Sequence, residues 1–169
     1  MVELTRSEMS ENRFLQALMR LPLRPLFKVF RYKPVVIDQQ TLHPEMQMLL
    51  LLRKIKQAPG IGDRPPHVSR KVLRRDARVH GLRAPQRAVT SKDLAIPSPV
   101  GNTINARLYQ PLKNSEKPGP LLVFFHGGGF VVGDVETYDG VCRFISQQSS
   151  VSVLSIDYRL APEHPFPNG

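Results

Sequence analysis

Three consecutive glycines, Gly127 to Gly129, follow His126 and are the residues of this sequence whose types and spacing most directly point to chemistry. Glycine lacks a Cβ atom and adopts positive φ angles as readily as negative ones. The backbone N–H groups of such a loop can therefore approach a ligand closely and point at a negative charge. A phosphate-binding loop would need G-x-x-x-x-G-K-[ST] or G-x-G-x-x-G at the start of a helix, and neither pattern is present. A tight turn with no ligand is the alternative interpretation of the glycines alone.

The sequence around these glycines predicts a strand, a loop, a helix and a second strand. Leu121–Phe125 is a continuous apolar run that breaks abruptly at His126, which is typical of a buried strand in a parallel sheet. Residues 151–156 form a second apolar strand, which ends in the motif DYRLAPEHPFP. Residues 138–149 have helical spacing, with four side chains on or near one face: Val141, Phe144, Ile145 and Gln148. A strand–helix–strand unit of this kind predicts a parallel sheet.

The pair of motifs, HGGGF and DYRLAPEHPFP some thirty residues later, resembles the hormone-sensitive-lipase-like branch of the α/β-hydrolases. These proteins are serine carboxylesterases and lipases with a helical cap. The resemblance covers about residues 120–169. It implies an α/β fold class, namely a partial α/β-hydrolase fold that holds the first strands of a mostly parallel sheet. It also implies a helical cap segment over residues 1–85 and the N-terminal part of the hydrolase core over residues 86–169.

The resemblance also implies roles for the residues of the glycine loop. Gly128 and Gly129 would carry the backbone N–H donors of an oxyanion hole, which stabilises the negatively charged oxygen of an acyl-transfer intermediate. Gly127 would let the loop turn, and His126 would support it by hydrogen bonds without acting as the base. The substrate would be a small acyl ester, with no metal or organic cofactor. The expected pocket lining is Phe130, Val131 and Val132.

Ester hydrolysis by an activated serine also needs a nucleophile, a base and an acid, and the sequence lacks the G-x-S-x-G motif of the nucleophile. In the family this motif lies on the next strand, beyond Gly169, followed by the acid and the histidine. His164 is flanked by prolines and matches a structural loop of the family, and Asp157 is expected to stabilise the loop at its strand end. We therefore expect no triad in this chain, which would be inactive without the missing C-terminal half. A catalytically dead binding or interaction protein that keeps the glycine-loop pocket is the alternative.

Charge is distributed unevenly along the chain, which has a formal net charge of +10. Residues 1–100 contain 19 Lys and Arg against 8 Asp and Glu, whereas residues 101–169 contain 5 against 6. Residues 13–33 alternate apolar and basic side chains, and Pro22 and Pro25 divide them into two short helices. The apolar runs in this segment are too short to span a membrane. Two interpretations stay open: a cap helix over the active site, or an amphipathic segment on a lipid surface.

Two further helices are predicted at residues 46–57 and 68–79. The second has a basic set that consists of Arg70, Lys71, Arg74, Arg75 and Arg78. No aromatic residue interleaves this set, and no zinc, helix-turn-helix or RNA-binding motif is present, so we do not expect a nucleic-acid partner. A solvated helix face is the favoured interpretation.

The remaining expectations concern the start of the sheet and the single cysteine. Residues 89–96 and 103–109 alternate apolar and polar side chains and predict an antiparallel hairpin through a turn at residues 99–102. Cys142 cannot form an internal disulfide, which favours a reducing, cytoplasmic compartment. Because no base is placed beside it in the sequence, we expect Cys142 to be a small core or surface residue and not a nucleophile.

Overall fold

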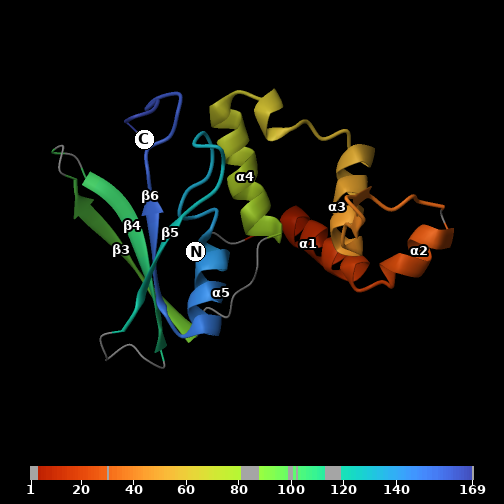
Figure 1. The fold of residues 1–169 in the computed structure, drawn as a ribbon, viewed down its shortest axis with the longest axis horizontal. Coiled ribbons are helices and arrows are strands. Elements are labelled where there is room, and N and C mark those ends of the chain that lie inside the picture. The colour runs from red at the N-terminus through yellow and green to blue at the C-terminus, as the bar shows by residue number, and fades with distance from the viewer. Residues whose placement is uncertain are drawn as a thin grey trace. The chain divides into compact units, whose positions relative to one another are not determined.

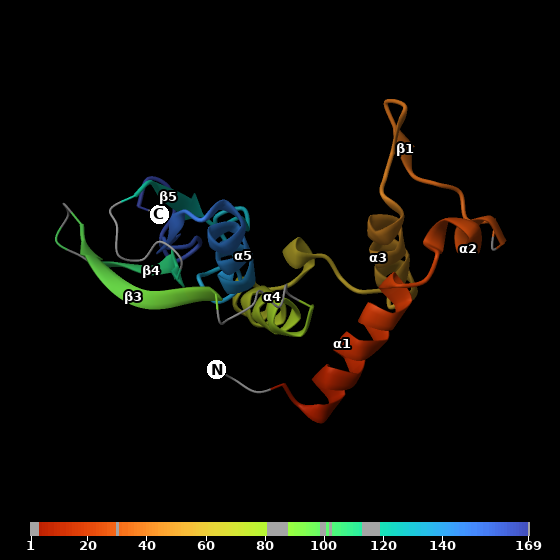
Figure 2. The ribbon, with the colours of Figure 1, turned by 90° about the horizontal axis from the view of Figure 1, so that it is seen from below.

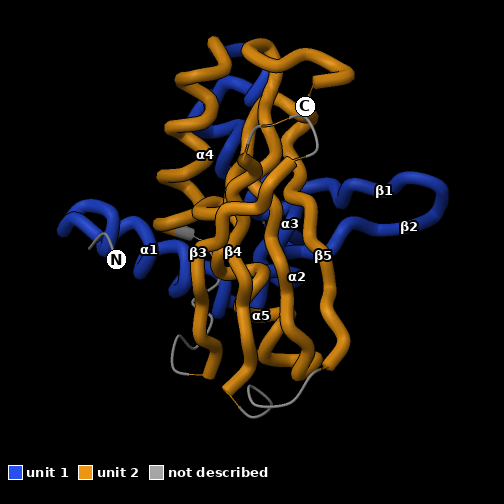
Figure 3. The backbone as a smooth tube through the Cα atoms, turned by 90° about the vertical axis from the view of Figure 1, so that its left-hand side faces the viewer, with its two compact units in different colours: residues 1–64 blue, residues 65–169 orange. Residues whose placement is uncertain are grey.

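The structure is a computed structural model that describes residues 4–29, 31–80, 88–98, 101, 103–112 and 119–168. The chain forms two compact units, residues 1–64 and residues 65–169, which are coloured separately in Figure 3. This division falls earlier than the boundary predicted between residues 85 and 86, because helix α4 (Pro66–His80) lies in the second unit. The assignment of residues 1–85 to a cap stays a prediction.

The first unit is helical (Figure 1). Its elements are α1 (Arg6–Met19), α2 (Leu23–Val29), the two-residue strands β1 (Val36–Ile37) and β2 (Gln40–Thr41), α3 (Pro44–Ile55) and the 3₁₀ turn η1 (Ile61–Asp63). Figure 2 shows the β1–β2 hairpin projecting beyond α3. The two helices predicted within residues 13–33 and the helix predicted at residues 46–57 are confirmed.

Helix α1 begins earlier than the apolar pattern indicates, since a capping box fixes its first turn. The Thr5 hydroxyl accepts from the Glu8 amide at 3.3 Å, and the Glu8 carboxylate accepts from the Thr5 amide at 2.9 Å. Helices α2 and α3 share a small core in which Leu23, Phe27 and Met48 are buried. Part of the apolar set of residues 13–33 is therefore used inside the first unit.

The second unit is a four-stranded sheet with helix α5 (Asp139–Ser149) on one face (Figure 1). Its strands are β3 (Val89–Pro97), β4 (Thr103–Pro111), β5 (Leu121–Phe125) and β6 (Ser152–Asp157), in the order β3-β4-β6-β5. The predicted hairpin is confirmed, because β3 and β4 are antiparallel, although residues 99, 100 and 102 of its turn lie outside the described residues. Strand β6 is parallel to β5 and antiparallel to β4, so the strand–helix–strand unit is confirmed within a mixed sheet.

The prediction that Leu121–Phe125 is buried is wrong. Leu121, Val123 and Phe125, which share one face of the strand, are 51%, 48% and 65% exposed, whereas Phe124 on the other face is half-buried and packs against the core. The reason is the position of β5 in the described sheet, where it is the edge strand and pairs only with β6. Contacts of α5 with the sheet concentrate on β4 and β6, and β5 contributes Phe124 to the core beneath the helix.

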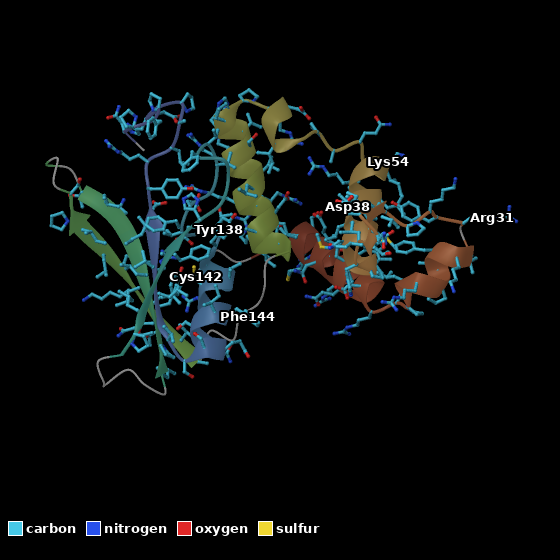
Figure 4. The ribbon with its side chains drawn as sticks, viewed as in Figure 1. Arg31, Asp38, Lys54, Tyr138, Cys142 and Phe144 are labelled. Carbon is cyan, nitrogen blue, oxygen red and sulfur yellow. The ribbon has the colours of Figure 1, made fainter. Side chains whose placement is uncertain are left out.

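The inward face of α5 also differs from the predicted one. Cys142 and Ser146 are fully buried, whereas Phe144 is 45% exposed. Cys142 packs in the core of this unit with Val89, Tyr109 and Val153, and Figure 4 shows it on the side of α5 that faces the sheet. Of the two expected locations, core or surface, Cys142 therefore occupies the core. Burial raises the pKa of its thiol to about 11.

A charged cluster attaches helix α5 to the sheet. It consists of Arg107 on β4, Asp93 on β3, and Asp139 and Arg143 on α5. Arg107 donates to Asp93 at 2.5 Å and to Asp139 at 3.3 Å. Arg143 donates to Asp139 at 2.8 Å. The buried Tyr109 hydroxyl donates to Asp139 at 3.0 Å. These contacts fix the start of α5, and thus the end of the loop that leads from β5 into it.

None of the helices in the described part of the chain is long and apolar enough to cross a membrane.

Candidate active site

The glycine loop leaves the end of β5 and folds back on itself. Three successive residues have positive φ angles: +135° at Gly128, +61° at Gly129 and +62° at Phe130. The amides of Val131 and Val132 both donate to the Gly128 carbonyl at 3.1 Å. A Cβ atom at Gly128 would lie 1.8 Å from the Val132 carbonyl oxygen. Only glycine fits at this position without a movement of the backbone.

The fold of the loop leaves the N–H groups of Gly128 and Gly129 without a protein acceptor among the described residues. Within the ranges that the structure describes, the amides of Gly128 and Gly129 donate to neither backbone nor side-chain atoms. They lie beside an open depression of about 370 Å³, whose lining is Phe125, His126, Gly127, Gly128, Gly129, Phe130 and Tyr158. Unengaged amides at the rim of an apolar depression can bind an oxyanion. Val131 is not part of the lining, and Val132 is buried.

His126 and Tyr158 join the two sequence motifs at the base of the loop. The Tyr158 hydroxyl donates to the His126 carbonyl at 2.6 Å. The imidazole is only 3% exposed and stacks on the Tyr158 ring, with centroids 4.1 Å apart and planes 13° apart. Its Nδ1–H donates to the Gly127 carbonyl at 3.0 Å. The carboxyl end of β5 is therefore tied to the residue that directly follows β6.

Gly133 closes the loop and was not singled out from the sequence. Its φ angle is +103°, and a Cβ atom there would lie 2.5 Å from both the Gly127 carbonyl oxygen and His126 Nδ1. The end of the loop thus packs directly against its beginning. A fourth glycine within seven residues was the available signal in the sequence.

Two carboxylates next to the loop have opposite pKa shifts. Asp134 is buried, which would raise its pKa, but hydrogen bonds from Arg74 and from the Thr137 amide and hydroxyl hold the pKa below its usual range. Burial raises the pKa of Asp157, and the charge of Asp134 raises it further. Asp157 lies at the end of β6, as predicted. Both carboxylates sit where the two parallel strands end.

Arg70, on helix α4, reaches both loops of this unit. It donates through Nε to the Val131 carbonyl at 2.8 Å and through an Nη to the Ala161 carbonyl at 2.8 Å. It also pairs with both carboxylate oxygens of Glu163, at 2.9 and 2.7 Å. The interpretation of the basic set on α4 as a solvated face is therefore wrong for Arg70. Arg74 is 61% exposed, as that interpretation expects, but it also pairs with Asp134. Their partners lie 60 or more positions away in the sequence.

His164, the other histidine considered from the sequence as a possible base, has a structural contact instead. His164 is exposed, and its amide closes a turn by donating to the Leu160 carbonyl at 2.9 Å. Among the described residues there is no group of three His, Cys, Asp or Glu side chains that could hold a metal ion.

Comparison with known proteins places this geometry in a family. The family model described as the alpha/beta hydrolase fold matches residues 122–169, which contain β5, the glycine loop, α5 and β6. These residues match that family model, and the second unit holds part of the α/β-hydrolase fold. The resemblance drawn from the HGGGF and DYRLAPEHPFP motifs is confirmed at this level.

The chain is similar to several proteins that are named as ester hydrolases. The chain is 42% identical over 135 residues, 80% of its length, to the carboxylic ester hydrolase LipN of Mycobacterium tuberculosis. It is 49% identical over 76 residues to the esterase LipI of the same organism. It also resembles the solved structure of the ester-hydrolase EH1AB1 from the Lake Arreo metagenome, complexed with a bipyridine phosphonate derivative. That match has a TM-score of 0.67 and 38% identity, over 75% of this chain and 41% of the other. The chain spans 35% of LipN and 23% of LipI.

Proposed function

We propose that the glycine loop is the oxyanion hole of a serine carboxylic-ester hydrolase and that Gly128 and Gly129 supply its donors. The observation that carries this proposal is the pair of unengaged amides, held by positive φ angles at the carboxyl end of β5. The serine, its base and its acid would come from sequence outside these 169 residues, in the remainder of a longer polypeptide or in a second chain.

The proposed chemistry is acyl transfer through a tetrahedral intermediate. The serine oxygen attacks the ester carbonyl carbon, and the carbonyl oxygen becomes an oxyanion that accepts from the amides of Gly128 and Gly129. Collapse of the intermediate expels the alcohol, and water then hydrolyses the acyl-enzyme by the same route. The donors need no rearrangement during the reaction, because the contacts of His126 and Tyr158 already hold the loop. One such donor is worth about 100- to 1,000-fold in rate.

The apolar rim of the depression supports the proposed substrate class. Phe130 is 72% exposed and lines it together with Phe125. We propose small acyl esters, with a short to medium acyl chain packed against these rings. His126 and Gly127 would act only as supports of the loop. The side chain of Val131 does not line the depression. Val131 would instead help to hold the loop through its backbone carbonyl, which accepts from Arg70.

Expression of the natural polypeptide from its own gene tests the proposal. Hydrolysis of p-nitrophenyl esters of increasing acyl length would give kcat/KM for each, with the highest value expected for short to medium chains. Absence of hydrolysis for every length would refute the proposal. The intact mass of the protein from its native source decides where the serine resides, because a mass near 19.1 kDa would require a second chain to supply it.

A binding protein that retains the loop but lacks chemistry is the competing function. Labelling with a fluorophosphonate probe separates the two, because only an activated serine reacts. An ester hydrolase would be labelled and inactivated in parallel. A binding protein would bind esters without being labelled.

A lipid surface is a second proposed partner, through residues 13–33. Phe14, Leu21 and Val29 are 61%, 49% and 76% exposed, and the basic side chains among them are also exposed, namely Arg13, Arg20, Arg24 and Lys28. An apolar and cationic surface of this kind suits anionic lipid. Co-sedimentation should be stronger with phosphatidylglycerol than with phosphatidylcholine vesicles and should weaken in Phe14→Ser and in high salt. Equal sedimentation with both vesicle types would exclude this partner.

A cytoplasmic location is proposed on the basis of the single cysteine. Cys142 is free and buried in the core, so the described fold uses no disulfide. Fractionation of the source cells, followed by detection with an antibody to this chain, tests the location; recovery outside the cytoplasm would refute it.

A further inference from the structure

Arg70 makes four hydrogen bonds to two loops that are separate in sequence from each other and from α4. One acceptor, the Val131 carbonyl, belongs to the glycine loop. The other three belong to the segment after β6: the Ala161 carbonyl and the two oxygens of Glu163. The guanidinium is thus shared between the two motifs that define the site. Its side chain is only 23% exposed, although Glu163 remains 54% exposed.

The same two loops are also joined directly. The Ala161 amide donates to the Phe130 carbonyl at 2.8 Å. Arg70 and Ala161 therefore hold the carbonyls of two consecutive residues, Phe130 and Val131, immediately after Gly129. A peptide group is planar, so fixing these carbonyls also fixes the N–H groups of Val131 and Val132, which both donate to the Gly128 carbonyl. That carbonyl lies in the same planar peptide group as the Gly129 N–H, so the direction of the Gly129 N–H is limited in turn.

We propose that Arg70 is a positioning residue for the oxyanion hole, because it clamps the glycine loop to the loop that follows β6. This inference rests on the proposed function for its catalytic consequence. Glu163 orients the guanidinium, and the planar fork of arginine allows it to donate to several acceptors at once. Lysine offers a compact ammonium on a flexible chain and cannot reproduce that geometry.

A simple structural salt bridge is the competing explanation, and it makes different predictions. An ion pair with an exposed partner contributes little to stability. If the pair were only structural, removal of Arg70 would change the melting temperature and leave the turnover of the folded enzyme unchanged. A clamp predicts a lower kcat with little change in KM, since the loop acts on the transition state.

The test compares Arg70→Gln, Arg70→Lys, Glu163→Gln and Lys71→Gln in the natural polypeptide. Lys71 is the matched control, since it is the exposed neighbouring cation on the same helix. Arg70→Gln should lower kcat for a p-nitrophenyl ester by about 10- to 100-fold with KM within about twofold. Arg70→Lys should recover only a small part of this loss, and Glu163→Gln should lose less than Arg70→Gln. Lys71→Gln should match wild type.

Hydrogen exchange gives a second readout that needs no activity. Three amides report on this region. Those of Val131 and Val132 donate within the glycine loop, and that of Ala161 donates to the loop from the segment after β6. In Arg70→Gln they should exchange about tenfold faster or more than in wild type, and Lys71→Gln should leave them unchanged. Unchanged exchange in Arg70→Gln, or an unchanged kcat in an active enzyme, would overturn the clamp. If the wild type hydrolyses no ester, the proposed function fails, and exchange alone decides whether Arg70 holds the loop.

Discussion

Gly128 and Gly129 both have positive φ angles, but they differ in how strictly each position requires glycine. A Cβ atom at Gly128 would collide with the backbone of Val132, at 1.8 Å from its oxygen and 2.6 Å from its carbon. A Cβ atom at Gly129 would meet no atom within 4 Å. Its cost would be the left-handed conformation, about 1–2 kcal/mol for a residue with a side chain.

The first prediction follows from this difference. In the natural polypeptide, Gly128→Ala should reduce ester hydrolysis by about 100- to 1,000-fold, because the loop must shift and a donor moves away from the oxyanion. Gly129→Ala should lower stability slightly and keep more of the activity. Steady-state kinetics and thermal melting of both variants measure these effects. A larger loss of activity in Gly129→Ala than in Gly128→Ala would contradict this account of the loop.

The carboxylate of Glu163 provides a pH prediction at the same scale. The hydrogen bond from Arg70 lowers its pKa to about 2 from the ordinary value of 4.5. The pair therefore contributes stability above the ordinary pKa, and this contribution is lost as the pH falls toward 2. Titration of the side-chain carbon by NMR should show the low pKa in wild type and a return toward 4.5 in Arg70→Gln. The same pKa in both proteins would show that the pair does not form in solution.

At the scale of single elements, helix α5 ends in a residue that is poorly suited to its conformation. Ser150 is left-handed, with φ and ψ of 56° and 28°, and glycine is preferred at this position after a helix. Ser150→Gly should therefore stabilise the protein by about 0.5–1 kcal/mol. Ser149→Gly is the control. Because Ser149 is the last residue of the helix, this change should lower the free energy of unfolding by about 1 kcal/mol. Denaturant unfolding measures both; a destabilised Ser150→Gly would refute the prediction.

Local patterns were sufficient to predict most elements of the second unit. The strands β3, β4, β5 and β6 follow from short apolar or alternating runs bounded by turn residues, and the two motifs predicted the glycine loop. The apolar run of β5 does not by itself show that one side of the strand is unpaired among the described strands. The partners of Arg70 were missed because hydrogen bonds across 61 and 93 positions leave no local pattern in the sequence.

At the scale of the whole molecule, β5 presents an apolar edge. Leu121, Val123 and Phe125 are exposed, and one side of the strand has no paired neighbour among the described strands. An open apolar edge of this kind promotes pairing with other chains. In a longer α/β-hydrolase polypeptide, a further strand would cover it.

Residues 1–169 produced alone should therefore be poorly soluble or self-associating, and Val123→Lys should reduce the association by placing a charge on the edge. Sedimentation velocity over a range of concentrations measures the association. A monomeric species with a cooperative melt would show that the exposed strand is not an open edge.

The most direct test of the central claim is a crystal structure of the natural polypeptide after reaction with a phosphonate ester. A phosphonylated serine carries an oxygen that imitates the oxyanion of the intermediate. We expect this oxygen to lie about 2.7–3.1 Å from the amide nitrogens of Gly128 and Gly129, with the serine outside residues 1–169. A phosphoryl oxygen bound to other donors, or a protein that the phosphonate does not modify, would contradict the assignment of the glycine loop as an oxyanion hole.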